Sequence, residues 1–90
     1  MSYKIKKYSL VQARKLGVKI QPSTKGQYKI DIFDKKDNYI TSIGNKNYSD
    51  YPSYLETDGK EYAETRRRLY RIRHSKDKGI KGFYAMNILW

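Results

Sequence analysis

The sequence contains no cysteine and a single histidine, His74. Without cysteine the chain cannot form disulfides, thiol nucleophiles or thiolate metal sites, and this composition is typical of a reducing compartment. One histidine cannot build a zinc site, and we interpret His74 as a helix-end residue, where a cationic side chain is favoured by the helix dipole. A magnesium site formed by Asp31, Asp34 and Asp37 is conceivable, but their spacing favours a solvated hairpin. We therefore predict a protein that is not an enzyme and binds no cofactor or metal.

Long apolar segments are also missing. No run approaches the roughly 20 residues of a membrane-spanning helix, and the N-terminal residues lack the apolar core of a signal peptide. From the sequence we expect a protein of the cell interior, neither secreted nor embedded in a membrane.

Acidic residues are few: nine, against 20 lysines and arginines, which gives a formal net charge of +11. The excess lies at the two ends, with +6 in residues 1–20, −1 in residues 21–59 and +6 in residues 60–90. Such asymmetry indicates a polyanionic partner, either nucleic acid or an acidic protein surface. The simpler alternative is that the charge only maintains solubility.

The 90 residues are enough for one domain with a modest core. A basic segment, residues 1–8, is expected to form a short strand or an ordered arm. Ser9 begins a capping box with Gln12 and predicts a helix over residues 9–16, which Gly17 would end.

Residues 27–34 alternate between apolar and polar side chains, which predicts the best strand of the chain. With the β-rich run at residues 39–43 they predict an antiparallel hairpin over residues 27–43. The tyrosine-rich residues 48–54 are expected to be irregular or to form one helical turn. The change to helical periodicity near residue 60 predicts an α+β fold, in which the hairpin packs against an Arg-rich helix and a C-terminal helix.

Residues 61–75 contain five arginines and neither glycine nor proline, which predicts the longest helix. At the helical step of about 100° per residue, Tyr62 and Leu69 fall on an apolar arc and are predicted core anchors. Arg66 and Arg73 fall on the same arc, where an unpaired charge is costly. We predict that both pair with acids inside the fold, with Asp50 as the preferred partner. Three further arginines fall on the opposite, cationic side: Arg67, Arg68 and Arg71.

The C-terminal residues 82–90 are the most hydrophobic stretch. Phe83 and Trp90 are predicted to be buried core anchors of a helix, because a small core can hardly leave its one tryptophan unused. The alternative is an exposed docking peptide.

Three motifs carry a resemblance over roughly residues 43–90. They are Ile43-Gly44 followed by Asn47-Tyr48-Ser49-Asp50-Tyr51, the arginine run ending Arg73-His74, and Gly79-Ile80 leading to Ile88-Leu89-Trp90. In this order and spacing they resemble a family of small basic proteins encoded by nucleocytoplasmic large DNA viruses of algae and amoebae. The resemblance implies a viral protein, located in the virion or inside the infected cell. That family has no established activity, so the resemblance implies no function.

Two functions remain open from the sequence. The first is sequence-independent binding of nucleic acid, with DNA as the expected partner, through phosphate contacts and stacking of tyrosines on unpaired bases. The second is a structural or adaptor role in the virion, with the arginines against acidic surfaces of other viral proteins. The predicted phosphate contacts are Arg67, Arg68, Arg71, Lys4, Lys6 and Lys7.

Overall fold

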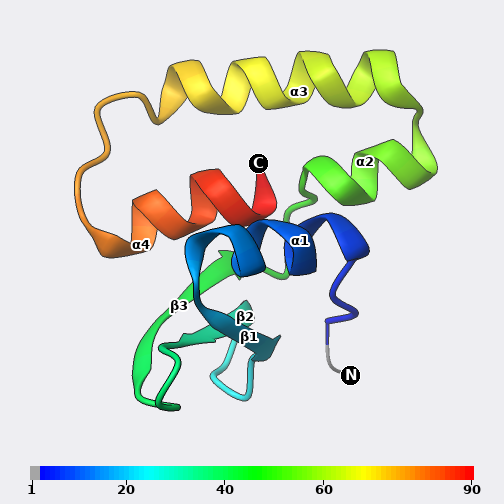
Figure 1. Ribbon diagram of the computed structural model, residues 1–90. Coiled ribbons are helices and arrows are strands. Elements are labelled where there is room, and N and C mark those ends of the chain that lie inside the picture. Colours follow the sequence, from blue (N-terminus) through cyan, green and yellow to red (C-terminus); the bar gives the residue numbers. More distant parts are fainter. Residues whose placement is uncertain (1–2) are drawn as a thin grey trace.

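The computed structural model describes residues 3–90 and is an α+β domain with a three-stranded antiparallel sheet (Figure 1). The elements are, in order, α1 (Lys7–Leu16), β1 (Lys19–Pro22), β2 (Tyr28–Phe33), β3 (Tyr39–Asn45), α2 (Tyr51–Thr57), α3 (Lys60–Arg73), α4 (Ile80–Tyr84) and the π-helix η1 (Ala85–Leu89). The α+β prediction is confirmed.

The sheet has the order β1-β2-β3, with β2 at its centre, and β2 and β3 form the predicted antiparallel hairpin. In the register of β2, Ile32 lies opposite Ile20 of β1, and Ile30 lies opposite Ile43 of β3. The hairpin turn is held by the Asp34 carboxylate, which accepts hydrogen bonds from the backbone N–H groups of Lys36 and Asn38. Such local side-chain bonds are the reason that aspartate favours turns.

The helices form two levels above the sheet (Figure 1). The first level contains α1 and the joined helices α4 and η1, and α3 crosses beyond them as the outermost element. The prediction that the hairpin packs against the Arg-rich helix is therefore wrong, because α3 packs mainly on α2 while α4 and η1 contact β3. Helical periodicity identifies which side of a helix is apolar, but it does not identify the element on which that side packs.

Helix α1 begins at Lys7, two residues before the predicted start, and ends as predicted at Gly17 in the left-handed conformation. Residues 3–6 form no strand, and residues 1–2 of the predicted basic segment lie outside the described residues. The predicted capping box is also wrong. Ser9 Oγ donates to the carbonyl of Ile88 at 2.8 Å, and Gln12 Nε2 donates to the carbonyl of Asn87 at 2.9 Å. Both side chains satisfy carbonyls at the end of η1, which would otherwise be unpaired.

The core lies between the sheet and the first helix level. Its fully buried side chains are Ile30, Ile32, Ile43, Ile88 and Leu89. Trp90 also lies in the core and is 9% exposed, so the C-terminal residues are not an exposed docking peptide.

Three of the predicted core anchors are not buried. Tyr62 is 47% exposed, Leu69 48% and Phe83 51%. For Tyr62 and Leu69 the reason is again the position of α3, in which Ala63 is the one residue that is buried. The apolar side of α3 instead faces a groove, and Phe83 packs edge-on against Tyr84 at the surface.

At Gly44 the backbone of β3 lies close to the side chain of Leu89 on η1. The φ of Gly44 is +79°, and a Cβ atom there would lie 2.7 Å from Leu89 Cδ1 and 3.0 Å from Lys29 Cδ. We expect Gly44→Ala to lower the free energy of unfolding by about 2–4 kcal/mol, from left-handed strain and overpacking together. Urea unfolding followed by circular dichroism measures this loss.

Gly26→Ala is the matched control. Gly26 also has a positive φ, +54°, but a Cβ atom there would meet nothing within 4 Å. It should therefore show only the strain of about 1–2 kcal/mol. Equal losses in the two variants would contradict tight packing at Gly44.

Candidate functional site: a basic aromatic groove

A groove of about 840 Å³ lies between part of α3 and the elements beneath it, η1 and the ends of β2 and β3. One wall is α3, the end is formed by residues 76–82, and the opposite side is formed by the ends of β2 and β3 and by η1. This volume is within the range of about 300–1,000 Å³ that is usual for binding sites.

The groove is cationic. Among the described residues, six basic side chains and one carboxylate, that of Asp77, line it. Arg66 and Arg73 lie on α3, seven residues and therefore about 10.5 Å apart along the helix axis. The basic residues are Lys29, Arg66, Arg73, Lys76, Lys78 and Lys81.

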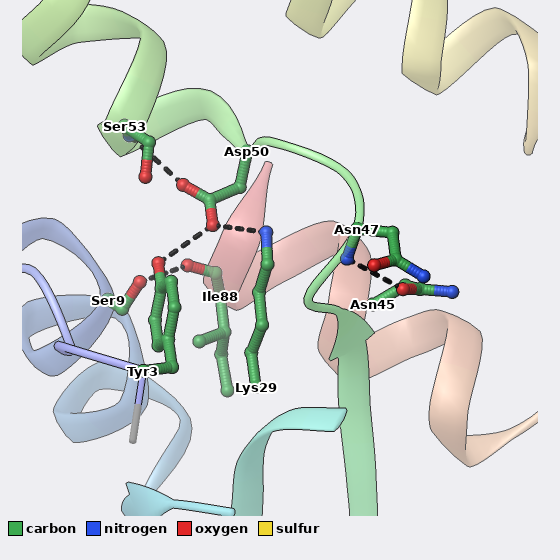
Figure 2. A network of polar contacts seen from close by, with 8 residues as sticks. All are labelled: Tyr3, Ser9, Lys29, Asn45, Asn47, Asp50, Ser53 and Ile88. Atoms are coloured by element: carbon green, nitrogen blue, oxygen red, sulfur yellow. Dashed lines mark hydrogen bonds and ion pairs between the residues drawn. The ribbon is translucent and has the colours of Figure 1, made fainter. Parts of the chain in front are cut away.

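Asp50 does not pair with Arg66 or Arg73, so that prediction is wrong. Asp50 Oδ2 accepts hydrogen bonds from Lys29 Nζ at 2.8 Å and from the Tyr3 hydroxyl at 2.7 Å, and both members of the ion pair are buried (Figure 2). Its Oδ1 accepts the backbone N–H of Ser53 at 3.0 Å, which caps α2. Three hydrogen bonds, one of them from the buried ammonium group of Lys29, satisfy this carboxylate, and no arginine forms an ion pair with it among the described residues.

The contacts of the Lys29–Asp50 pair keep the buried Asp50 carboxylate ionised. Burial by itself raises the pKa of Asp50, but the hydrogen bond and charge of Lys29, with the Ser53 and Tyr3 hydrogen bonds, hold that pKa below its ordinary value. The pKa of the Tyr3 hydroxyl is raised, first by burial and then by the Asp50 charge. Asp50 is therefore ionised and Tyr3 neutral over the physiological range.

Arg66 and Arg73 keep free hydrogen-bonding capacity. The Arg66 guanidinium lies 5.7 Å from the Tyr54 ring centroid, and its Nε is buried with no partner in the described part of the chain. Arg73 is exposed, and within residues 3–90 no carboxylate lies within 4.0 Å of it. The two arginines that sequence periodicity placed on the apolar arc are thus groove residues.

Aromatic rings line the same groove. Tyr70 stacks on Trp90 at 4.3 Å with an interplanar angle of 7°, and on its other face stacks on His74 at 4.2 Å. His74, the C-cap residue of α3, has its Nδ1 2.5 Å from Asp77 Oδ2. Tyr48, which follows β3 on the side of the groove opposite α3, is 72% exposed.

The outer side of α3 carries the arginines that the sequence predicted as the main footprint. Arg67 lies 4.5 Å from the Tyr51 ring centroid and 3.6 Å from Glu64, and Arg71 donates to the backbone oxygen of Trp90 at 3.2 Å. Arg68 is exposed. Arg67 and Arg71 are therefore partly engaged within the fold, although the Arg67 Nε, like that of Arg66, is buried with no partner among the described residues.

Of the three N-terminal lysines predicted to contact phosphates, one is already paired with an acid within the fold. Lys6 pairs with Glu56 at 3.1 Å, whereas Lys4 and Lys7 are exposed. Residues 76–82 also contribute to the groove through Lys76, Lys78 and Lys81, none of which was a phosphate contact predicted from sequence. Their alternating lysines were the available signal, but only the fold brings them opposite Arg66 and Arg73.

The conceivable magnesium site is not assembled. Ser23 and Ser42 donate to Asp31 Oδ1 at 2.5 and 2.6 Å, while Asp34 holds the hairpin turn. Within the described residues no group of three histidine or acidic side chains could hold a metal ion. None of the helices described combines the length and apolar character needed to cross a bilayer.

Comparison of the chain with protein-family models, with curated proteins and with solved structures finds no match. The resemblance to a viral protein family therefore stays a prediction.

Proposed function

We propose that this protein binds nucleic acid, without enzymatic activity, by sequence-independent contacts to phosphates in the basic aromatic groove. The observation that carries the proposal is the set of groove cations that lack a carboxylate partner among the described residues: Arg66, Arg73, Lys76, Lys78 and Lys81. Cations that are not neutralised internally can each contact a phosphate and release a counterion.

The spacing of these cations favours a polymer over a small anion. Arg66 and Arg73 lie about two helical turns apart on α3, and Lys76, Lys78 and Lys81 line the end of the groove, so the cations are spread along it and are not gathered at one point. A chain of phosphates can contact both arginines, and then the lysines at the end of the groove. DNA is the expected polymer, in keeping with the prediction from sequence.

The first test is a triple variant of the groove, Arg73→Gln with Lys76→Gln and Lys81→Gln. Contacts by five cations predict a slope of log K against log salt of about −3.5 for single-stranded DNA, at about −0.7 per phosphate. The triple variant should lower affinity at least about tenfold near 100 mM salt and reduce the slope by about 2, for all sequences alike. Fluorescence anisotropy with labelled oligonucleotides measures both quantities.

Two matched triple variants locate the footprint. Lys25→Gln with Lys35→Gln and Lys36→Gln removes the same charge outside the groove and should change the slope little. Arg67→Gln with Arg68→Gln and Arg71→Gln tests the outer side of α3. If this outer variant weakens binding more than the groove variant does, the groove assignment is wrong.

Trp90 supplies a reporter within the site, because it is the one tryptophan and lines the groove. DNA that enters the groove should change its fluorescence emission. The change should be lost in the groove triple variant and kept in Arg68→Gln, which removes an exposed arginine of the outer side; Arg71 is left in place because it donates to the Trp90 backbone oxygen. Poly-glutamate of the same charge is the control for binding to any polyanion. Absence of DNA binding at about 50 mM salt, where electrostatic association is strong, would overturn the proposal.

An assembly contact is the second candidate function, as a structural component or adaptor of a virion. The observation that favours it is the exposure of Leu69 and Ile72, which lie three residues apart and are therefore neighbours on the surface of α3. Exposed apolar side chains beside arginines are typical of protein interfaces. Self-association in light scattering that Ile72→Glu abolishes, together with absent DNA binding, would favour this candidate over the first.

A further inference from the structure

We infer that the groove takes a single strand rather than a duplex, with an unpaired base stacked on the ring of Tyr48. This inference rests on the proposed function and specifies its ligand.

Tyr48 is the groove ring that remains available. It is 72% exposed and, in the part of the chain that the structure describes, it has neither an aromatic neighbour in stacking range nor a cation over its ring. The other rings are engaged. Tyr70 has both faces covered, Tyr54 lies under Arg66, and the ring of Tyr28 has Lys81 Nζ 4.0 Å from its centroid.

The backbone of Tyr48 is held in place. Its N–H donates to the carbonyl of Asn45 at 3.0 Å, and the N–H of Asn47 donates to Asn45 Oδ1 at 2.8 Å (Figure 2). Asp50, two residues further on, is anchored by Lys29 and Ser53. The ring is thus exposed while the chain that carries it is tied at both sides, which lowers the entropy lost when a ligand stacks on it.

Tyr48 lies opposite the arginines, an arrangement that suits a nucleic-acid strand with its phosphates on one side and its bases on the other. Arg66 and Arg73 on α3 can contact phosphates, and Tyr48 lies across the groove at the end of β3. A strand whose backbone follows α3 therefore turns its bases toward Tyr48. In a duplex the base faces are covered by their neighbours, so only an unpaired base can stack there.

The test compares three ligands of about 12 nucleotides, within the usual site sizes for single-strand binders. They are single-stranded oligo-dT, a duplex and an abasic strand, which keeps the phosphates and has no bases. The wild-type protein should bind oligo-dT most tightly. Tyr48→Ala should lower that affinity about fivefold or more, the loss expected for one base–ring stack, without changing the salt slope or the affinity for the abasic strand.

Two further variants serve as controls. Tyr48→Phe keeps the ring and should bind oligo-dT within about twofold of the wild type. Tyr39→Ala removes a half-exposed tyrosine that does not line the groove, and should leave binding unchanged once circular dichroism shows that it is folded.

The outcomes separate the inference from the proposed function. If duplex and oligo-dT bind equally and Tyr48→Ala has no effect, while the groove triple variant still weakens both, single-strand stacking is wrong and phosphate binding stands. If no oligonucleotide binds at about 50 mM salt, the proposed function fails and the inference fails with it. Equal binding of poly-glutamate and oligo-dT would also overturn both.

Discussion

Asp50→Ala is expected to lower the free energy of unfolding by about 3–5 kcal/mol, because it leaves the ammonium group of Lys29 buried without its partner. The substitution also removes the side-chain cap of α2 and the acceptor of the Tyr3 hydroxyl. For a small domain this is a large fraction of the total stability. Urea unfolding at neutral pH measures the loss.

The double variant Lys29→Met with Asp50→Ala separates the charge from the other contacts. Removing the buried cation as well should restore part of the lost stability, since a buried pair replaced on both sides is often close to neutral. Glu56→Ala, on the same helix, removes the partner of Lys6 at the surface and should have little effect, because an exposed ion pair contributes little. A double variant no more stable than Asp50→Ala would contradict an electrostatic origin.

The difference in free energy of unfolding between the wild type and Asp50→Ala should depend on pH in a direction that the pKa of Asp50 determines. The pKa of Asp50 is lowered in the folded protein, so its contribution is fully present above the unfolded value of about 3.9 and is lost as the pH falls through the lower folded value. The stability difference between the wild type and Asp50→Ala should therefore be largest near pH 6–7 and shrink below about pH 4. A difference that stays constant down to pH 2 would show that the Asp50 charge does not matter.

Deletion of Leu89 and Trp90 is expected to unfold the protein or make it insoluble. Leu89 is fully buried against Gly44, and Trp90 stacks on Tyr70 and lies 6.2 Å from Tyr54. Loss of one large buried side chain costs about 2–5 kcal/mol, and two such losses approach the whole stability of a domain of this size. Circular dichroism and the solubility of the truncated chain are the measurements.

Milder substitutions keep this prediction testable if the truncation yields no protein. Trp90→Ala should lower the free energy of unfolding by about 3–5 kcal/mol, whereas Trp90→Phe keeps a ring against Tyr70 and should lose less. A truncated chain that melts at the wild-type temperature would contradict the core position of Trp90 and restore the docking-peptide interpretation.

The sequence by itself determined the types of the main elements, the hairpin and helix α3. Side-chain alternation in residues 27–34 and helical spacing after residue 60 are local properties, so the hairpin and α3 could be recognised without the fold. The burial of Trp90 also followed from composition, whereas the same reasoning failed for Phe83, which is half exposed. The uneven distribution of net charge along the chain was also known from the sequence, because it requires only the positions of the charged residues.

Only the tertiary structure decided which groups meet. The alternation of β2 placed Lys29 on a polar side, yet α2 begins above it and its cap residue Asp50 becomes the partner of that lysine instead of an arginine. Spacing along α3 placed Arg66, Arg73 and Leu69 on one side of the helix. It could not show that this side lines a groove, because helical periodicity gives the direction of a side chain and not the element that it faces. The groove exists because α3 rests on α2 and leaves α4, η1 and β3 uncovered beneath it, and pairings between segments so distant in sequence leave no local pattern.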